Sequence, residues 1–300
     1  MIEVTKLRKR FDKNTALDGL DLRVKKGSIY GLIGVNGSGK TTALKAITGI
    51  LRADAGEARM DGEDVYENLA LKARIGFIPD ELFFFGSYSL DECAAFYRRL
   101  YPNWDAARCA EMKERFALPA RRRVSRFSKG MQKQAAFLLT MSAMPDYLIL
   151  DEPIDGLDPI VRKLVWKYIV DDVAARGMTV LVSSHNLREM EGICDSIGIL
   201  DGGKMLIERD LDELKSDIHK VQAAFPKGAP EEGRYDGLNV LHRETRGAVE
   251  LMIIRSPEET VRRVIGARSP LVFDLLPLSL EEIFIYELGG ERDALGNIVF

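Results

Sequence analysis

The chain has 300 residues, of which 46% are hydrophobic and 30% are charged, and its formal net charge is -3. This is the composition of an ordinary soluble globular protein with enough apolar material for a core, and its slightly acidic balance excludes a general attraction to nucleic acid. Cys93, Cys109 and Cys194 are too few and too scattered for a disulfide framework or a zinc site, which favours a reducing cytosol.

Two segments bear on a membrane location. The first residues, MIEVTKLRKRF, lack the apolar core of a signal peptide. The longest apolar-leaning run, AAFLLTMSAM at residues 135–144, is shorter than the roughly 18 residues of a membrane span. If the protein works at a membrane, we therefore expect a separate chain to supply the membrane part.

The first chemical signal is GVNGSGKTT at residues 34–42, which follows the strand-like run SIYGLI. The residues that match the P-loop pattern G-x-x-x-x-G-K-[ST] are Gly34, Gly39, Lys40 and Thr41. Backbone N–H groups of such a loop surround phosphate oxygens, and the next helix, expected over about residues 40–51, adds its positive dipole end. We expect Lys40 to reach the β- and γ-phosphates and the Thr41 hydroxyl to bind Mg²⁺. The alternative is a turn that fits the pattern by chance.

A second signal is YLILDEP at residues 147–153, an apolar strand that ends in two carboxylates. Asp151 stands where a P-loop NTPase holds its Mg²⁺. A second acid is superfluous for the metal, so Glu152 suits a general base that polarises an attacking water. The alternative is a solvated turn that caps the helix after Pro153.

The chain changes character from about residue 215. The segments KVQAAF, NVLHRET, VELMIIR and LVFDLL read as strands, and PEETVRRVIGA and SLEEIFIYELG read as helices. Ser279 and Glu282 fit the N-cap and N3 positions of a capping box on the last helix. We expect an appended α/β domain with a Pro/Gly-rich edge at PKGAPEEG and a loosely held tail, ERDALGNIVF. We recognise no set of catalytic residues in the sequence of this appended domain.

Several motifs, in order, resemble those of the ATP-binding cassette (ABC) ATPases. GVNGSGKTT resembles the Walker A loop, YLILDE the Walker B strand, IDGLDP the D-loop and VSSH the switch strand. Most discriminating is FSKGMQKQ at residues 127–134, which is similar to the signature LSGGQ. The resemblance implies an α/β fold: a P-loop NTPase cassette over residues 1–214, with a mixed β-sheet core and a helical subdomain at about 81–145. The small α/β domain at residues 215–300 would follow it.

The resemblance also implies an ATP and Mg²⁺ site and assigns its residues. Glu152, His185 and Lys40 would be catalytic, with His185 close to the γ-phosphate. The residues that would contact the nucleotide are Phe11, Ala16, Asn36, Gly37, Ser38, Gly39, Lys40, Thr41, Thr42, Ser128, Gly130 and Asp158. The metal ligands would be Thr41, Asp151 and Asp80. Phe11, expected to stack on adenine, has the alternative of a core aromatic, and His185 that of a helix start.

Two departures from the family pattern affect the expected function. In the signature, Lys129 replaces a glycine and Met131 replaces the glutamine, and this S-K-G-M form is similar to that of ABC-2 exporter cassettes. It favours export over import. In IGFIPDE, the family usually has glutamine where Asp80 stands, and whether Asp80 or Glu81 takes its role is open. A carboxylate can bind magnesium, but it adds negative charge near the nucleotide.

The assembly that the resemblance implies is a pair of cassettes, as a homodimer or heterodimer, which sandwich ATP head to tail. Integral membrane permease subunits in separate chains would do the transport, so the protein would be cytoplasmic and peripheral on the cytoplasmic face of the cell membrane. LFFFGSY at residues 82–88 would serve partly as core and partly as a groove for a membrane-subunit helix. The alternative is a soluble ABC ATPase that acts on ribosomes or DNA. A single P-loop, the absence of long heptads and the acidic balance disfavour it, and we expect no nucleic acid partner.

Overall fold

The computed structural model describes residues 1–226 and 233–287, in two compact units. The first unit is Met1–His185 with Gly192–Glu208, and the second is Asn186–Glu191 with the chain from Arg209 onward. The tail ERDALGNIVF and most of the PKGAPEEG edge lie outside the described residues. We keep the domains 1–214 and 215–300 as a proposal.

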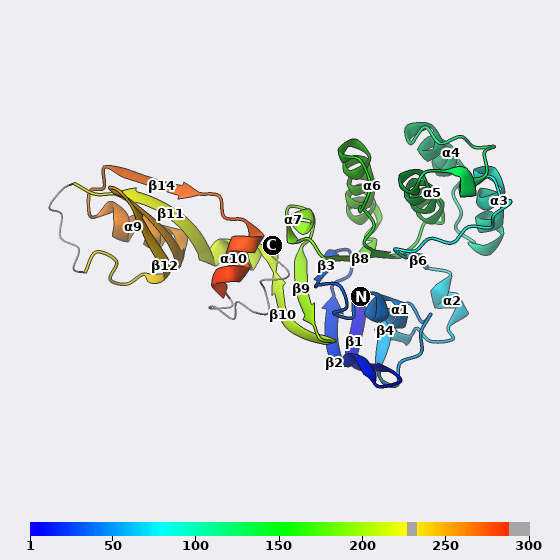
Figure 1. Ribbon diagram of the computed structural model, residues 1–300, viewed down its shortest axis with the longest axis horizontal. Helices are drawn as coiled ribbons and strands as arrows, with labels where there is room; N and C mark the ends of the chain where they lie inside the picture. Colours follow the sequence, from blue (N-terminus) through cyan, green and yellow to red (C-terminus); the bar gives the residue numbers. More distant parts are fainter. Residues whose placement is uncertain (227–232, 288–300) are drawn as a thin grey trace. The chain divides into compact units, whose positions relative to one another are not determined.

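Two sheets form the framework of the first unit (Figure 1). The larger has the strand order β10-β9-β3-β8-β7-β6, and its pairs from β9 to β6 are parallel. Its strands are β3 (Ile29–Ile33), β6 (Ile75–Ile78), β7 (Tyr147–Asp151), β8 (Thr179–Ser184), β9 (Ser196–Asp201) and β10 (Lys204–Asp210). Every residue of β3, β7 and β8 is buried, as expected for parallel strands covered on both faces.

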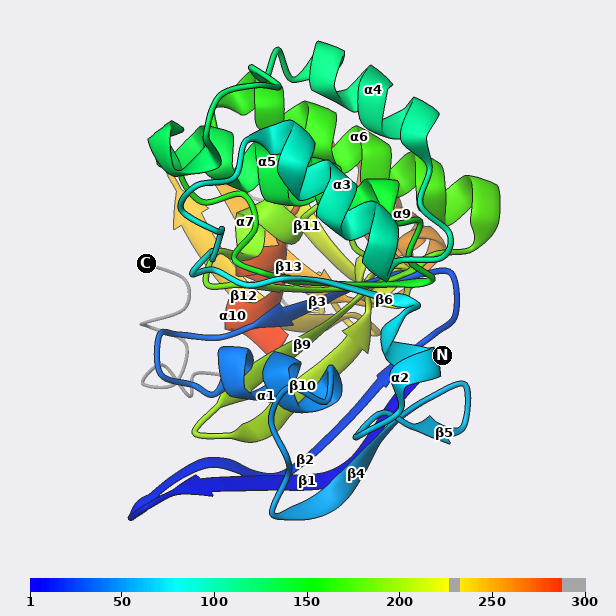
Figure 2. The same cartoon turned by 90° about the vertical axis from the view of Figure 1, so that its right-hand side faces the viewer.

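The smaller sheet is antiparallel, with the order β2-β1-β4-β5. Its strands are β1 (Ile2–Phe11), β2 (Asn14–Val24), β4 (Ala55–Met60) and β5 (Glu63–Asp64). Helix α1 (Lys40–Ile47) lies between the two sheets (Figures 1 and 2). Its Leu44 packs in one core with Leu32 of β3 and Val4 of β1, so the helix that follows the P-loop is anchored on both sides.

Longer helices cover the opposite face of the six-stranded sheet (Figure 2). The remaining helices of this unit are α2 (Leu69–Lys72), α3 (Leu90–Leu100), α4 (Ala106–Arg115), the 3-10 turn η1 (Val124–Arg126), α5 (Lys129–Ser142) and α6 (Pro159–Arg176). The range 81–145, predicted as a helical subdomain, contains α3, α4, η1 and α5. Of the described helices, none is both long and apolar enough to cross a bilayer.

Helix α1 is shorter than the sequence predicts, because it ends at Ile47 rather than near residue 51. Gly49 has a φ of 66°, the left-handed conformation that commonly ends a helix. The Thr48 hydroxyl donates to the Leu44 carbonyl at 2.8 Å, and the Ile50 N–H returns to the Lys45 carbonyl at 2.9 Å. The sequence predicted a later end because apolar residues continue the helical pattern through Leu51.

The second unit contains an antiparallel sheet of order β12-β13-β11-β14. Its elements are α7 (Leu187–Met190), α8 (Leu211–Asp217), β11 (Ile218–Ala224), β12 (Asn239–Arg246), β13 (Val249–Arg255), α9 (Glu258–Gly266), β14 (Val272–Leu276) and α10 (Leu280–Glu287). All four predicted strands and both predicted helices are present. The predicted capping box is confirmed, because the Glu282 N–H donates to the Ser279 hydroxyl at 3.3 Å and the Ser279 N–H to the Glu282 carboxylate at 3.1 Å.

Helix α9 packs on one face of this sheet through Val261 and Ile265, over Val221, Met252 and Ile254. Elsewhere in the same unit, α7 contacts α10, where the Arg188 guanidinium pairs with the Glu281 carboxylate at 2.8 Å. Helix α7 begins just after His185, so the chain passes directly from the predicted switch residue into this helix.

Candidate active site

A cavity of about 460 Å³ lies beside the P-loop, where β3 gives way to α1 and the β1–β2 turn comes close. Ten of the predicted site residues line it: Phe11, Ala16, Asn36, Gly37, Gly39, Lys40, Thr41, Thr42, Asp80 and Glu152. Phe11 is 46% exposed, which argues against the alternative of a core aromatic. The lining also includes Asn14 and the Gly202–Gly203 turn after β9, which the sequence did not single out.

The P-loop backbone leaves donors for an anion. Helix α1 begins after Gly39 with no side chain that caps its first turn, so the first N–H groups of the helix are available to a ligand. Gly39 has a φ of 108°, and a Cβ there would lie 2.5 Å from the Ala16 carbonyl oxygen. Only glycine fits this position. Ser38 is buried, and its hydroxyl has no hydrogen-bond partner.

The three predicted catalytic side chains converge at one carboxylate. Lys40 Nζ lies 3.3 Å from Glu152 Oε1, and His185 Nδ1 lies 3.0 Å from Glu152 Oε2. Lys40 also donates to the Gly34 carbonyl at 2.6 Å. Its side chain is 6% exposed and that of Glu152 is 12% exposed. Glu152 therefore stands between a buried cation and an imidazole at the edge of the P-loop cavity.

Asp151 is held by a residue whose role the sequence did not reveal. β7 and β8 run in parallel with Asp151 opposite Ser183, and the Ser183 hydroxyl donates to Asp151 Oδ1 at 2.6 Å. Asp151 is 1% exposed, and its Oδ2 has no hydrogen-bond partner. A buried carboxylate oxygen without a donor is costly, and a bound cation would satisfy it. The residues present thus fit a divalent metal beside the P-loop. Finding Ser183 from sequence requires the strand register.

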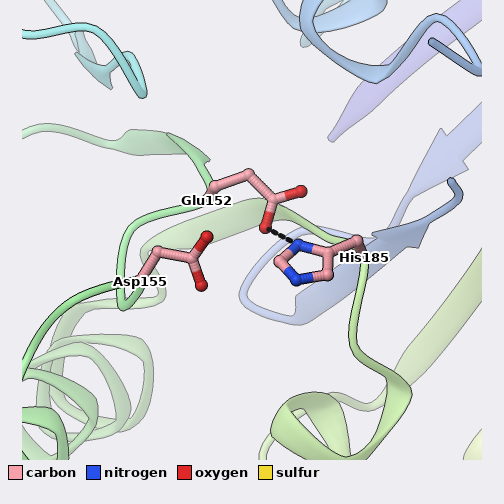
Figure 3. Close-up of side chains that lie close together, drawn as sticks. All are labelled: Glu152, Asp155 and His185. Atoms are coloured by element: carbon pink, nitrogen blue, oxygen red, sulfur yellow. Dashed lines mark hydrogen bonds and ion pairs between the residues drawn. The ribbon is translucent and has the colours of Figure 1, made fainter. Parts of the chain in front are cut away.

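Figure 3 shows the Asp155 carboxylate beside Glu152 and His185. Each of the three side chains offers a ligand atom, and these atoms lie within 4.8 Å of one another. The set has the ligand types of a metal centre, but Lys40 Nζ lies 3.3 Å from the same Glu152 carboxylate and opposes a cation there. Asp155 lies within the IDGLDP segment, but nothing in the sequence predicted that its carboxylate lies close to His185.

Asp80, rather than Glu81, is among the residues that line the cavity. Its Oδ1 lies 3.4 Å from Lys133 Nζ, and the same ammonium group donates to the Glu152 backbone carbonyl at 2.9 Å. Lys133 lies in α5, within the segment FSKGMQKQ, and was not predicted as a site residue. These contacts link Asp80, the signature helix and Glu152.

The predicted signature and D-loop residues lie at helix starts. Ser128 is the N-cap of α5 and accepts a hydrogen bond from the Met131 N–H at 3.3 Å. Asp158 is the N-cap of α6 and accepts from the Ile160 and Val161 N–H groups at 3.0 Å. Both side chains are exposed. Within the part of the chain that the structure describes, neither they nor Gly130 belong to the lining of the P-loop cavity.

Comparison with known proteins decides the family. A family model described as ABC transporter matches residues 17–155. The ABC transporter ATP-binding protein YtrB of Bacillus subtilis (strain 168) is 34% identical over 292 residues, which cover 97% of this chain and 99% of the relative. The chain belongs to the ABC transporter ATP-binding family. It is therefore an ATP-binding, ATP-hydrolysing cassette subunit, and the predicted family and enzyme class are confirmed.

Other relatives of this ABC cassette are named for export or resistance. The Daunorubicin resistance ATP-binding protein DrrA3 of Streptomyces coeruleorubidus is 35% identical, with 72% of this chain and 70% of the relative covered. The Nod factor export ATP-binding protein I of Paraburkholderia xenovorans (strain LB400) is 34% identical, with 97% of each chain covered.

Solved cassettes share the fold. A structure described as the ATP binding subunit of an ABC transporter has a TM-score of 0.68 at 26% identity and covers 72% of this chain and 92% of that one. A dimeric cassette, MJ0796, bound to ADP and Pi, has a TM-score of 0.64 at 20% identity and covers 70% of this chain and 99% of that one. The predicted fold class is thereby confirmed.

Proposed function

We propose that this cassette binds MgATP in the P-loop cavity and hydrolyses it to drive export through separate permease subunits, as one member of a cassette pair. The observation that carries the proposal is the position of Glu152. Its carboxylate lies 3.3 Å from Lys40 Nζ and 3.0 Å from His185 Nδ1, at the edge of the cavity. A general base must lie within hydrogen-bond reach of the attacking water, and Glu152 lies beside Lys40, the residue that would bind the γ-phosphate in this proposal.

The cavity offers a contact for each part of the nucleotide. The exposed Phe11 ring provides a face for adenine, and the uncapped start of α1 provides N–H donors for phosphate, with Asn36, Gly37, Ser38 and Thr42 in or beside the loop. Lys40 exchanges its contact with the Gly34 carbonyl for phosphate oxygens. Thr41, Asp151 and Asp80 would hold Mg²⁺, which when bound neutralises charge on the β- and γ-phosphates.

Hydrolysis then proceeds by in-line displacement. Glu152 takes a proton from a water molecule as the water oxygen attacks the γ-phosphorus. The bond from that phosphorus to the β–γ bridging oxygen breaks, which leaves ADP and inorganic phosphate. His185 holds the second oxygen of the Glu152 carboxylate and thereby fixes the orientation of the base.

The signature residues support a paired cassette. Ser128 and Gly130 start helix α5, and the Ser128 side chain is exposed, so the N-terminal end of α5 is open to a ligand brought by a second molecule. Asp158 is likewise exposed at the start of α6. We infer that these residues complete the ATP site of the partner cassette, in a homodimer or a heterodimer.

The membrane partner is inferred from relatives and from one surface. Relatives of this chain are named for Nod factor export and bacitracin transport, which favours export and a position at the cytoplasmic face of the membrane. Phe83 is 82% exposed and contacts Phe85, which packs against Phe96 of α3. Such an apolar patch suits a helix of a permease subunit. The relative YtrB is named an ABC transporter ATP-binding protein, which also disfavours an ATPase that acts on ribosomes or DNA.

The test is Glu152→Gln in the full chain, with Glu114→Gln on the exposed face of α4 as the matched control. We expect the first variant to bind ATP with wild-type affinity but to release phosphate at least 100-fold more slowly, because the amide cannot take the proton. The control should turn over normally. Normal phosphate release by Glu152→Gln would remove Glu152 from its proposed role.

A further inference from the structure

Lys133 lies at the junction of three parts of the site. It belongs to α5, five residues after the exposed N-cap Ser128, and its side chain is only 14% exposed. Its ammonium group donates to the Glu152 backbone carbonyl at 2.9 Å and lies 3.4 Å from Asp80 Oδ1. A lysine with a long flexible side chain is held in this position at an entropic cost, so its contacts must return a comparable stabilisation.

The Glu152 backbone requires such support. Its φ is 47°, in the left-handed region that a residue with a side chain rarely adopts. A residue in that conformation costs on the order of 1–3 kcal/mol and persists only where its surroundings fix it. The Ser183 carbonyl and hydroxyl accept from the Glu152 N–H at 3.3 and 3.2 Å, and Lys133 binds its carbonyl. The backbone N–H and carbonyl of Glu152 are therefore both held by residues outside β7.

The positive charge of Lys133 also offsets the negative charge of Asp80. Asp80 follows β6 by two residues and adds a second carboxylate to the cavity that Glu152 also lines. An uncompensated set of carboxylates would repel the nucleotide phosphates. The Lys133 ammonium offsets the charge of Asp80 and joins its loop to the catalytic residue.

We propose that Lys133 is a positioning residue for ATP hydrolysis: it fixes the Glu152 backbone and couples the orientation of its carboxylate to the Asp80 loop. This inference rests on the proposed role of Glu152 as general base. Lys133 itself touches neither water nor phosphate in this scheme. A shift of the Asp80 loop would move the ammonium group and, through it, the base.

The experiment compares Lys133→Met, Lys133→Gln and Lys133→Arg in the full chain, with Lys163→Met on the exposed face of α6 as control. We expect Lys133→Met to lower kcat about 10-fold or more, while KM for ATP changes less than about 3-fold, because nucleotide contacts remain. Lys133→Gln keeps a donor for the carbonyl and should fall between Met and wild type. Lys133→Arg should restore most of kcat, and Lys163→Met should match wild type.

A double-mutant cycle with Asp80→Asn tests the coupling. If Lys133 acts with Asp80, the loss in kcat of the double variant will differ by at least about 3-fold from the product of the two single losses. Wild-type kcat in Lys133→Met, or equal losses in kcat and ATP affinity together with a lowered melting temperature, would overturn the proposal. Either result with an inactive Glu152→Gln overturns only the role of Lys133, whereas an active Glu152→Gln overturns the proposed function itself.

Discussion

The contact between Ser183 and Asp151 gives a quantitative prediction. Ser183 is 0% exposed, and its hydroxyl is the donor to Oδ1 of the buried Asp151 carboxylate, at 2.6 Å. Ser183→Ala removes that donor and the acceptor of one Glu152 N–H bond. A hydrogen bond to a charged group contributes about 1.5–3 kcal/mol. In a unit of this size each kcal/mol shifts the melting temperature by about 2–4 °C, so we expect a fall of roughly 3–12 °C.

The assay is calorimetric unfolding of the full chain, with Ser142→Ala as control. Ser142 is also 0% exposed, but its hydroxyl donates to the neutral Leu138 carbonyl at 2.7 Å. Its loss should cost only about 0.5–1.5 kcal/mol. Ser183→Ala should also slow ATP turnover, because Asp151 and Glu152 both lose a partner. If Ser183→Ala has the melting temperature of the wild type, or one no lower than that of Ser142→Ala, the Ser183 hydroxyl does not stabilise the buried Asp151 carboxylate.

Three further predictions concern other parts of the molecule. Lys40→Ala should weaken ATP binding about 10- to 100-fold in a titration, because it loses a charge-assisted phosphate contact; unchanged affinity would contradict the phosphate site. Ser128→Arg should leave ATP binding by the monomer intact but prevent cassette pairing, and light scattering that shows dimers with MgATP would refute this. Glu250→Gln should destabilise the second unit by about 3–5 kcal/mol, because it breaks the buried pair with Arg234 at 2.6 Å. Burial opposes ionisation of Glu250, but hydrogen bonds from Tyr235 and Arg243 hold its pKa below the ordinary value. The loss of stability relative to wild type should therefore be complete above about pH 5. It should shrink as the pH falls through that lowered pKa. A difference that does not depend on pH would contradict this assignment.

The sequence predicted the parts of the site that local pattern determines. The P-loop and the Walker B strand were visible because residue type and order along one short segment dictate them. The end of α1 was predicted too late, since Gly49 stops the helix while apolar residues continue the periodic pattern. The capping box at Ser279 was correct because it depends on residues within one turn.

Contacts between distant segments could not be predicted in the same way. Ser183 meets Asp151 only because β8 pairs with β7 in one particular register. Lys133 reaches Glu152 because the tertiary fold brings the start of α5 beside the residue that follows β7, and nothing in FSKGMQKQ distinguishes this lysine from a solvated one. Asp155 faces His185 through the fold of the loop after β7. Each is a tertiary contact of a common polar residue, for which a single sequence carries no signal.

ATP-dependent pairing of two cassettes is tested by the mass of the Glu152→Gln protein in solution, measured by light scattering with and without MgATP. We expect a monomer without nucleotide and a stable particle of twice that mass with MgATP, because ATP joins the P-loop of one cassette to Ser128 of another and cannot be cleaved. Adding the Ser128→Arg substitution should return the mass to that of the monomer. A Glu152→Gln protein that binds ATP and stays monomeric at every concentration would show that ATP does not join two cassettes.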